Sequence, residues 1–169
     1  MNRFLNFLYT ACAVLAALFM ALIAVLILAQ TIGRMFGVVV PDANELAGFA
    51  FAALVFLALA PTLRAGGHIR VTLLLSRLPA SLHRWFEIWC LLISLGLVGY
   101  TTYWIIDLTY GSYSYHDVST GVLALPLWIP QAGMAFGLIV MTLSLIEILV
   151  GLIRGIEPPY AGKEGEANE

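Results

Sequence analysis

Charged residues are missing from four long stretches of this chain. No Asp, Glu, Lys or Arg occurs from Phe4 to Gly33, from Leu46 to Leu63, from Ile88 to Ile106 or from Val118 to Ile146. A helix that rises about 1.5 Å per residue needs roughly 20 apolar residues to cross a hydrocarbon core about 30 Å thick. Each stretch supplies about that number, so the sequence predicts an all-α integral membrane protein with four transmembrane helices.

The composition supports this prediction and excludes some other classes of protein. Hydrophobic residues make up 62% of the chain and charged residues 11%, whereas a soluble domain carries about 25% charged residues. The formal net charge of −2 gives no basic surface for nucleic acid. Cys12 and Cys90 both fall within predicted spans, where a lone thiol behaves as a small apolar side chain. We therefore expect no nucleic-acid partner, no disulfide and no metal site.

The basic residues predict the orientation of the spans, which we place at residues 8–32, 43–63, 85–108 and 129–153. Of the basic residues, only Arg34 falls on the side of the membrane opposite to both termini. The side that holds the termini carries Arg3, Arg64, Arg70, Arg77, Arg84, Arg154 and Lys163. Short cytoplasmic segments of membrane proteins are enriched in Lys and Arg, so we expect both termini in the cytoplasm of a bacterial cell, beneath its inner membrane.

The segments outside the spans suggest two further features. Between the second and third spans, Val71, Leu74, Leu75 and Leu78 recur at helical spacing while arginines lie off that stripe, which predicts an amphipathic helix in contact with the membrane lipids. Gly66 and Gly67 would supply the bend into this helix, since glycine adopts conformations closed to other residues. Residues 1–157 then form the transmembrane domain, and the polar, acidic residues 158–169 form a disordered cytoplasmic tail.

Several residues mark the ends of the predicted spans. Asp42 and Glu45 have the spacing of a capping box at the start of the second span. Pro126 and Pro130 bracket the start of the fourth, where a missing N–H costs least. Four tryptophans fall near span ends, where an indole ring is buried while its N–H stays wet, and we expect them to act as interfacial anchors: Trp85, Trp89, Trp104 and Trp128.

The chain carries little chemistry at membrane depth. His68, His83 and His116 all lie in connectors, so facing histidines that could hold a haem between helices are not available. Phosphate loops, zinc motifs and nucleophile elbows are also missing from the sequence. Asp107 and Asp117 flank a Tyr- and Ser-rich segment that we interpret as a solvated outer loop. We therefore expect neither an enzyme nor a cofactor.

Glu147 is the one carboxylate clearly inside a span. A charge there is costly and is usually paired, or lines a polar path. One interpretation is a proton or ion site, as in small exporters built around a single intramembrane Glu. The other, which we favour because no second carboxylate lies at depth in the membrane, is a Glu that reaches the cytoplasmic surface or pairs with a basic residue on a neighbouring helix.

Two small-residue motifs predict close contacts between helices. Gly133 and Gly137 form a GxxxG motif in the fourth span, and Ala13, Ala17 and Ala21 form a ridge on the first. Such ridges let helices approach closely in lipid, where association depends on van der Waals contact rather than on hydrophobic burial. The sequence leaves open whether they pack within this chain or onto a partner.

Taken together, two segments resemble a known family. The first runs from Glu45 through a Leu- and Ala-rich helix to Arg64-Ala65-Gly66-Gly67-His68-Ile69-Arg70-Val71 and then Leu78-Pro79. The second is Ser119-Thr120-Gly121 followed by Leu125-Pro126-Leu127-Trp128-Ile129-Pro130-Gln131. Both resemble the small membrane subunit of tripartite ATP-independent periplasmic (TRAP) transporters, and the similarity extends over residues 8–154.

The resemblance implies a subunit rather than a complete machine. In such systems a periplasmic binding protein captures an organic acid, and a large multispanning subunit carries the substrate and cation sites and moves them. The small subunit would act as a scaffold, with Glu45, Arg64, Gly66, Gly67, His68, Arg70, Gly133, Gly137 and Glu147 as candidate interface or structural residues. Two other classes stay open, which are a self-sufficient small carrier or channel that uses Glu147 and a structural membrane protein without a transport role.

Overall fold

The structure, a computed structural model, describes residues 3–66 and 80–156. Four helices account for most of this described part: α1 (Arg3–Met35), α2 (Ala43–Arg64), α4 (Ala80–Ser114) and α5 (Trp128–Ile153). All four are long and apolar enough to cross a membrane. For the described residues, the prediction of an all-α chain with four helices long and apolar enough to cross a membrane is therefore confirmed.

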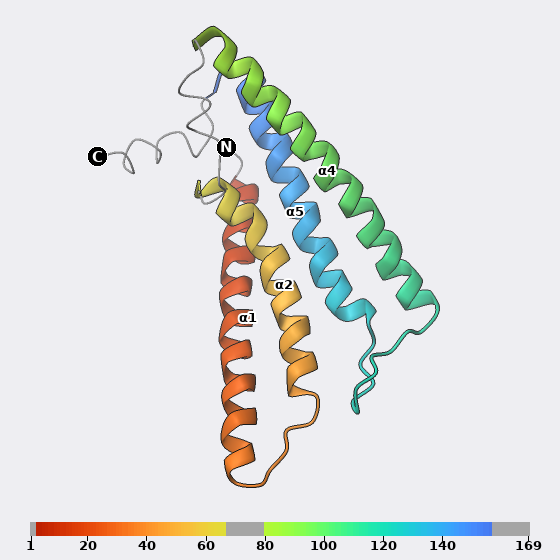
Figure 1. The fold of residues 1–169 in the computed structure, drawn as a ribbon. Coiled ribbons are helices and arrows are strands. Elements are labelled where there is room, and N and C mark those ends of the chain that lie inside the picture. The colour runs from red at the N-terminus through yellow and green to blue at the C-terminus, as the bar shows by residue number, and fades with distance from the viewer. Residues whose placement is uncertain (1–2, 67–79, 157–169) are drawn as a thin grey trace, which may run out of the picture.

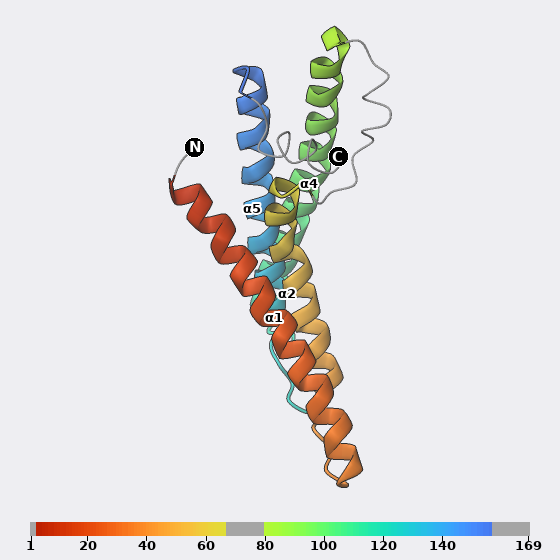
Figure 2. The same ribbon diagram turned by 90° about the vertical axis from the view of Figure 1, so that its left-hand side faces the viewer.

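The helices lie side by side in the order α1, α2, α5, α4 (Figure 1). α2 packs between α1 and α5, and α5 packs between α2 and α4, while α1 touches α5 only weakly. In the view turned by 90°, the helices spread apart towards the end at which α1 and α4 begin (Figure 2). The molecule is thus an open row of helices in which α1 and α4 form the two edges.

α1 and α4 are longer than the sequence predicts. α1 has 33 residues and α4 has 35, against predicted spans of residues 8–32 and 85–108. Charged residues limit the part of a helix that can lie in hydrocarbon, but the helix itself continues into the headgroup layer and the water. As a result, Asp107, Tyr110 and Tyr113 lie on the last turns of α4, and the prediction that the outer loop begins there is wrong.

Glycines and prolines end the helices where the sequence indicates. Gly37, Gly66 and Gly155 follow α1, α2 and α5 with φ of 73°, 76° and 79°, the left-handed conformation that commonly ends a helix. α5 begins at Trp128, between Pro126 and Pro130, as predicted.

The capping box at the start of α2 is a wrong prediction. Asp42 adopts a left-handed backbone conformation, with φ of 54°, and its side chain caps no backbone N–H of α2 within the described chain. A capping residue normally holds an extended conformation that turns its side chain back over the first turn. The left-handed conformation directs the carboxylate of Asp42 elsewhere, to the α4–α5 loop, as detailed below.

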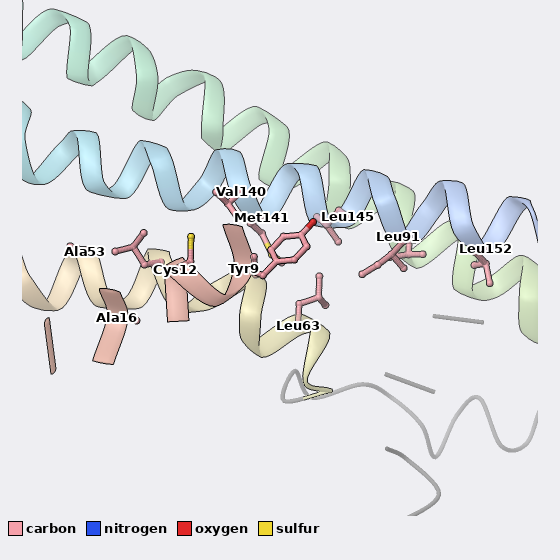
Figure 3. Packing of buried hydrophobic residues seen from close by; sticks show 13 residues of the cluster. Tyr9, Cys12, Ala16, Ala53, Leu63, Leu91, Val140, Met141, Leu145 and Leu152 are labelled. Atoms are coloured by element: carbon pink, nitrogen blue, oxygen red, sulfur yellow. The ribbon is translucent and has the colours of Figure 1, made fainter. Parts of the chain in front are cut away.

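The buried core lies where α1, α2 and α5 meet, with Leu91 of α4 beside it (Figure 3). Tyr9, Cys12 and Ala16 of α1 recur at helical spacing, and in Figure 3 Tyr9 lies between α1 and the α5 residues Met141 and Leu145. These side chains, rather than Ala13, Ala17 and Ala21, form the buried face of α1. The predicted alanine ridge is exposed in the structure.

Two predictions fall outside the described residues. The amphipathic interfacial helix would occupy part of residues 67–79, and the disordered tail would occupy residues 158–169. Both remain predictions, as does the extent of the transmembrane domain.

Candidate functional site

The ends of three helices meet at a polar cluster formed by Tyr9, Arg64 and Glu147. Arg64, the last residue of α2, places Nη1 2.6 Å from Oε2 of Glu147 on α5. The hydroxyl of Tyr9 on α1 donates to the same Glu147 oxygen over 3.0 Å. The Arg64 guanidinium also lies over the Tyr9 ring, with Cζ 4.3 Å from the ring centroid, and Nη2 lies 3.4 Å from Oδ1 of Asn6. The cluster therefore connects α1, α2 and α5.

The charged side chains of the cluster are largely buried. The side chains of Arg64 and Glu147 are 13% and 24% exposed. Arginine stays protonated in proteins, so Arg64 places a positive charge directly against the carboxylate. Glu147 therefore has both a charged partner and a hydrogen-bond donor within this cluster. The prediction that Glu147 pairs with a basic residue on a neighbouring helix is confirmed, with Arg64 as the partner.

A second contact joins the opposite ends of the helices. The backbone N–H of Leu123, in the α4–α5 loop, donates to Oδ2 of Asp42 over 2.6 Å. A Cβ added at Gly121 would meet the carboxylates of Asp42 and Glu45, which would have to shift, so the loop lies close against the start of α2. The loop is closed on itself by Ser119, whose N–H donates to the carbonyl of Leu125 and whose Oγ accepts from the Leu125 N–H. Glu45 and the Ser119-Thr120-Gly121 segment, distant in sequence, thus form one contact.

The GxxxG motif forms the seam between α5 and α2. A Cβ on Gly137 would lie 2.5 Å from the backbone carbonyl carbon and oxygen of Phe56 and 2.9 Å from the backbone N of Leu57. At Gly133 the same added atom would sit 3.5 Å from Cβ of Ala53, an ordinary contact. Both glycines therefore face α2, which answers the question that the sequence left open: this motif packs within the chain.

Polar contacts also join α4 to α5. The hydroxyls of Thr102 and Thr142 lie 3.1 Å apart, and each also bonds to a carbonyl of its own helix. Nη2 of Arg84 donates to the carbonyls of Leu152 and Ile153 over 2.9 and 3.0 Å. A cation at the C-terminus of a helix satisfies carbonyls that the helix itself leaves unbonded and favours the helix dipole. Arg84 therefore fastens the start of α4 to the end of α5.

The remaining predicted residues are placed as follows. Gly66 ends α2, whereas Gly67, His68 and Arg70 lie outside the described residues. The four tryptophans are exposed, Trp85 and Trp89 on the first turns of α4, Trp104 farther along it and Trp128 at the start of α5. Their role as interfacial anchors remains a prediction.

A comparison of the sequence with models of protein families found a match. Residues 23–155 match the family model described as tripartite ATP-independent periplasmic transporters, DctQ component. The match covers more than half of the chain. The chain belongs to this family. A search of the curated proteins found no match.

DctQ proteins are membrane components of transporters, and the family works with a DctM subunit and a DctP binding protein. Most of the contacts described above lie within the matched range, including those of Asp42, Arg64, Gly137 and Glu147. Tyr9 and Asn6 lie before it. In this DctQ-family chain, sequence analysis did not identify Tyr9, Asn6 or Arg84 as members of a site. The available signal was that Asn6, Tyr9 and Thr10 are polar residues at one end of a long apolar run.

Proposed function

We propose that this DctQ-family chain is the scaffold subunit of a binding-protein-dependent secondary transporter that imports organic acids across a bacterial inner membrane. In this proposal a large multispanning subunit carries the substrate and uses a cation gradient, and a periplasmic protein delivers the substrate. The small chain braces the part of the large subunit that stays still.

The state of Glu147 carries the proposal. A coupling site needs a carboxylate that can release its proton or exchange a cation, and such groups in membranes line a polar path. Glu147 instead forms an ion pair with Arg64 and accepts a hydrogen bond from Tyr9. The carboxylate therefore serves to hold helices together, which favours a scaffold over a self-sufficient carrier or channel.

The exposed edges of the row support a partner of large apolar area. α1 and α4 each bury only a small part of their surface within the chain, although both are apolar. Exposed aromatic and aliphatic side chains cover the outer face of α4, among them Trp89, Leu97 and Tyr100. A membrane partner that packs against these edges would supply the van der Waals contact by which helices associate in lipid.

Reconstitution into liposomes tests the proposal. Vesicles would hold this chain alone, the large subunit alone or both, each with the binding protein and a labelled organic acid, under an imposed cation gradient. We expect uptake only when both membrane chains are present. Uptake by this chain alone would establish a self-sufficient carrier. Full uptake by the large subunit alone would support a structural protein without a transport role.

A further inference from the structure

A polar crevice lies between α1 and α2, at the opposite end from the Tyr9, Arg64 and Glu147 cluster. Its volume is about 450 Å³, and it is lined by Gln30, Thr31 and Arg34 of α1 and by Asn44 of α2. Thr31 uses its hydroxyl to bond the carbonyl of Ile27. The other three lining residues carry amide and guanidinium groups.

The spacing along both helices puts this crevice at the edge of the hydrocarbon. Arg64 lies over the Tyr9 ring, so α1 and α2 are level with each other at that point. From Thr10 to Gln30, and again from Arg64 back to Asn44, the helix rises about 30 Å, which is about the thickness of a hydrocarbon core. The crevice therefore lies at the depth of the lipid headgroups, in the leaflet away from the termini.

The positive charge of Arg34 would attract an anion to the crevice. Within residues 3–66 and 80–156, the side chain of Arg34 has no ion-pair or hydrogen-bond partner. The carboxylate of Asp42 accepts from Leu123, and Glu45 lies against Gly121, so both face the α4–α5 loop. A guanidinium offers a planar fork of donors that fits phosphate, and the amides of Gln30 and Asn44 add further donors.

The surroundings of Arg34 favour a lipid over a free anion. Towards the middle of the membrane, on the face of α1 that carries Arg34, Ile27 and Met20 are 51% and 63% exposed. A free phosphate or carboxylate would satisfy the guanidinium but would leave these apolar side chains uncovered. A phospholipid brings a phosphate and apolar chains together, so it satisfies both. We propose that the Gln30, Thr31, Arg34 and Asn44 crevice binds the phosphodiester headgroup of an anionic phospholipid.

Native mass spectrometry on the purified full-length chain tests this site. The chain would be stripped of lipid and offered phosphatidylglycerol, diacylglycerol, which has the same chains but no phosphate, or inorganic phosphate. The variants are Arg34→Gln, Asn44→Leu and, as the matched control at the other end of α1, Arg3→Gln. We expect the wild type and Arg3→Gln to retain phosphatidylglycerol about fivefold or more over diacylglycerol, and Arg34→Gln to lose most of this preference.

Each other outcome would overturn the proposal. Equal retention by Arg34→Gln and the wild type would show that Arg34 does not bind the headgroup. Displacement of phosphatidylglycerol by millimolar inorganic phosphate would identify a free-anion site. If Arg34→Gln kept the lipid but lost a co-purifying protein, the crevice would instead hold an acidic group of that protein. Should Arg34→Gln fail to fold, Asn44→Leu decides, because a headgroup site predicts a two- to threefold weaker preference there and unchanged retention would contradict it.

Discussion

The contact between Arg64 and Glu147 shows how one residue's environment changes its role. An isolated carboxylate in a span is costly, but here it is joined by an arginine that cannot lose its proton and by a tyrosine hydroxyl. Partner and carboxylate are both largely withdrawn from solvent, so each needs the other. A pair of this kind adds little stability over two apolar residues, yet breaking it is costly, because one charge is left unpaired.

A double-mutant cycle on Arg64→Gln and Glu147→Gln measures this dependence. Each single change leaves one partly buried charge alone, so we expect each to lower the free energy of unfolding by about 1–3 kcal/mol. The double variant leaves no unpaired charge, so its loss of unfolding free energy should be smaller than the sum of the two single losses. The difference should be at least about 1 kcal/mol, which is a typical coupling energy for residues in contact. Unfolding in detergent micelles, followed by circular dichroism, gives the values.

The Glu147→Gln substitution also tests function. With Glu147→Gln, the carboxamide oxygen can still accept the Tyr9 hydrogen bond, so uptake per assembled complex should be largely kept. Asp107→Asn removes an exposed carboxylate from α4 and is the matched control, expected to change neither stability nor uptake. If the Glu147→Gln complex assembled and was abundant but showed no uptake, Glu147 would have to be regarded as an ion site.

At the scale of elements, the α5–α2 seam depends on one glycine far more than on the other. A methyl group on Gly137 would meet the backbone of Phe56 and Leu57, which cannot move without separating the helices, whereas on Gly133 it would meet only Ala53. We expect Gly137→Ala to lower the free energy of unfolding by about 1–3 kcal/mol, the usual cost of overpacking. Gly133→Ala, its matched control, should change stability by less than about 0.5 kcal/mol. If Gly137→Ala and Gly133→Ala destabilised the protein equally in thermal unfolding, the close contact of Gly137 with α2 would be contradicted.

The hydrogen bond between Asp42, at the start of α2, and the α4–α5 loop leads to a separate prediction. Asp42→Ala removes the acceptor for the Leu123 N–H, so the amides of residues 118–125 should exchange with solvent faster, by roughly fivefold for a bond worth about 1 kcal/mol. Asp42→Asn keeps an acceptor oxygen and should show a smaller increase. Hydrogen exchange followed by mass spectrometry checks both. Unchanged exchange in Asp42→Ala would show that Gly121 packing alone holds the loop.

The elements were predictable from the sequence because lipid permits so few alternatives. Long uncharged runs have to form helices there, so the number of spans and the starts of α2 and α5 followed directly. Helix ends outside the hydrocarbon were not predictable in this way, and α1 and α4 exceed their predicted lengths. Asp42 was assigned a cap from spacing alone, but its left-handed backbone directs the side chain to a loop that follows some 80 residues later.

The site was predictable only in part, for a related reason. Sequence patterns indicated that Glu147 needs a partner and that Gly133 and Gly137 need a neighbouring helix. Neither pattern could name Arg64 or α2, because those contacts depend on the order of helices in the row, and any adjacent helix satisfies a small-residue motif. The alanine ridge of α1 illustrates this limit, since it has the right residues but lies on an exposed face.

In the whole molecule, the two ends of the row of helices differ in their basic residues. Arg3, Arg64, Arg84 and Arg154 lie at one end of the helices, and Arg34 lies at the other. The polar contacts follow the same division, with the arginine contacts at the first end and the carboxylate contacts of Asp42 and Glu45 at the second. Short cytoplasmic segments carry the excess of Lys and Arg, so we expect the first end to face the cytoplasm.

Cysteine labelling tests this orientation. Cys12 is buried and Cys90 is exposed along α4, so both would first be changed to serine. Val122, at 84% exposed, marks the α4–α5 loop, and Ile156, at 61%, marks the segment after α5. A membrane-impermeant maleimide added to cells with a permeable outer membrane should label Val122→Cys at once and Ile156→Cys only after the inner membrane is opened. The reverse pattern would place the arginine-rich end outside, and with it the Arg64 and Glu147 cluster on the periplasmic face.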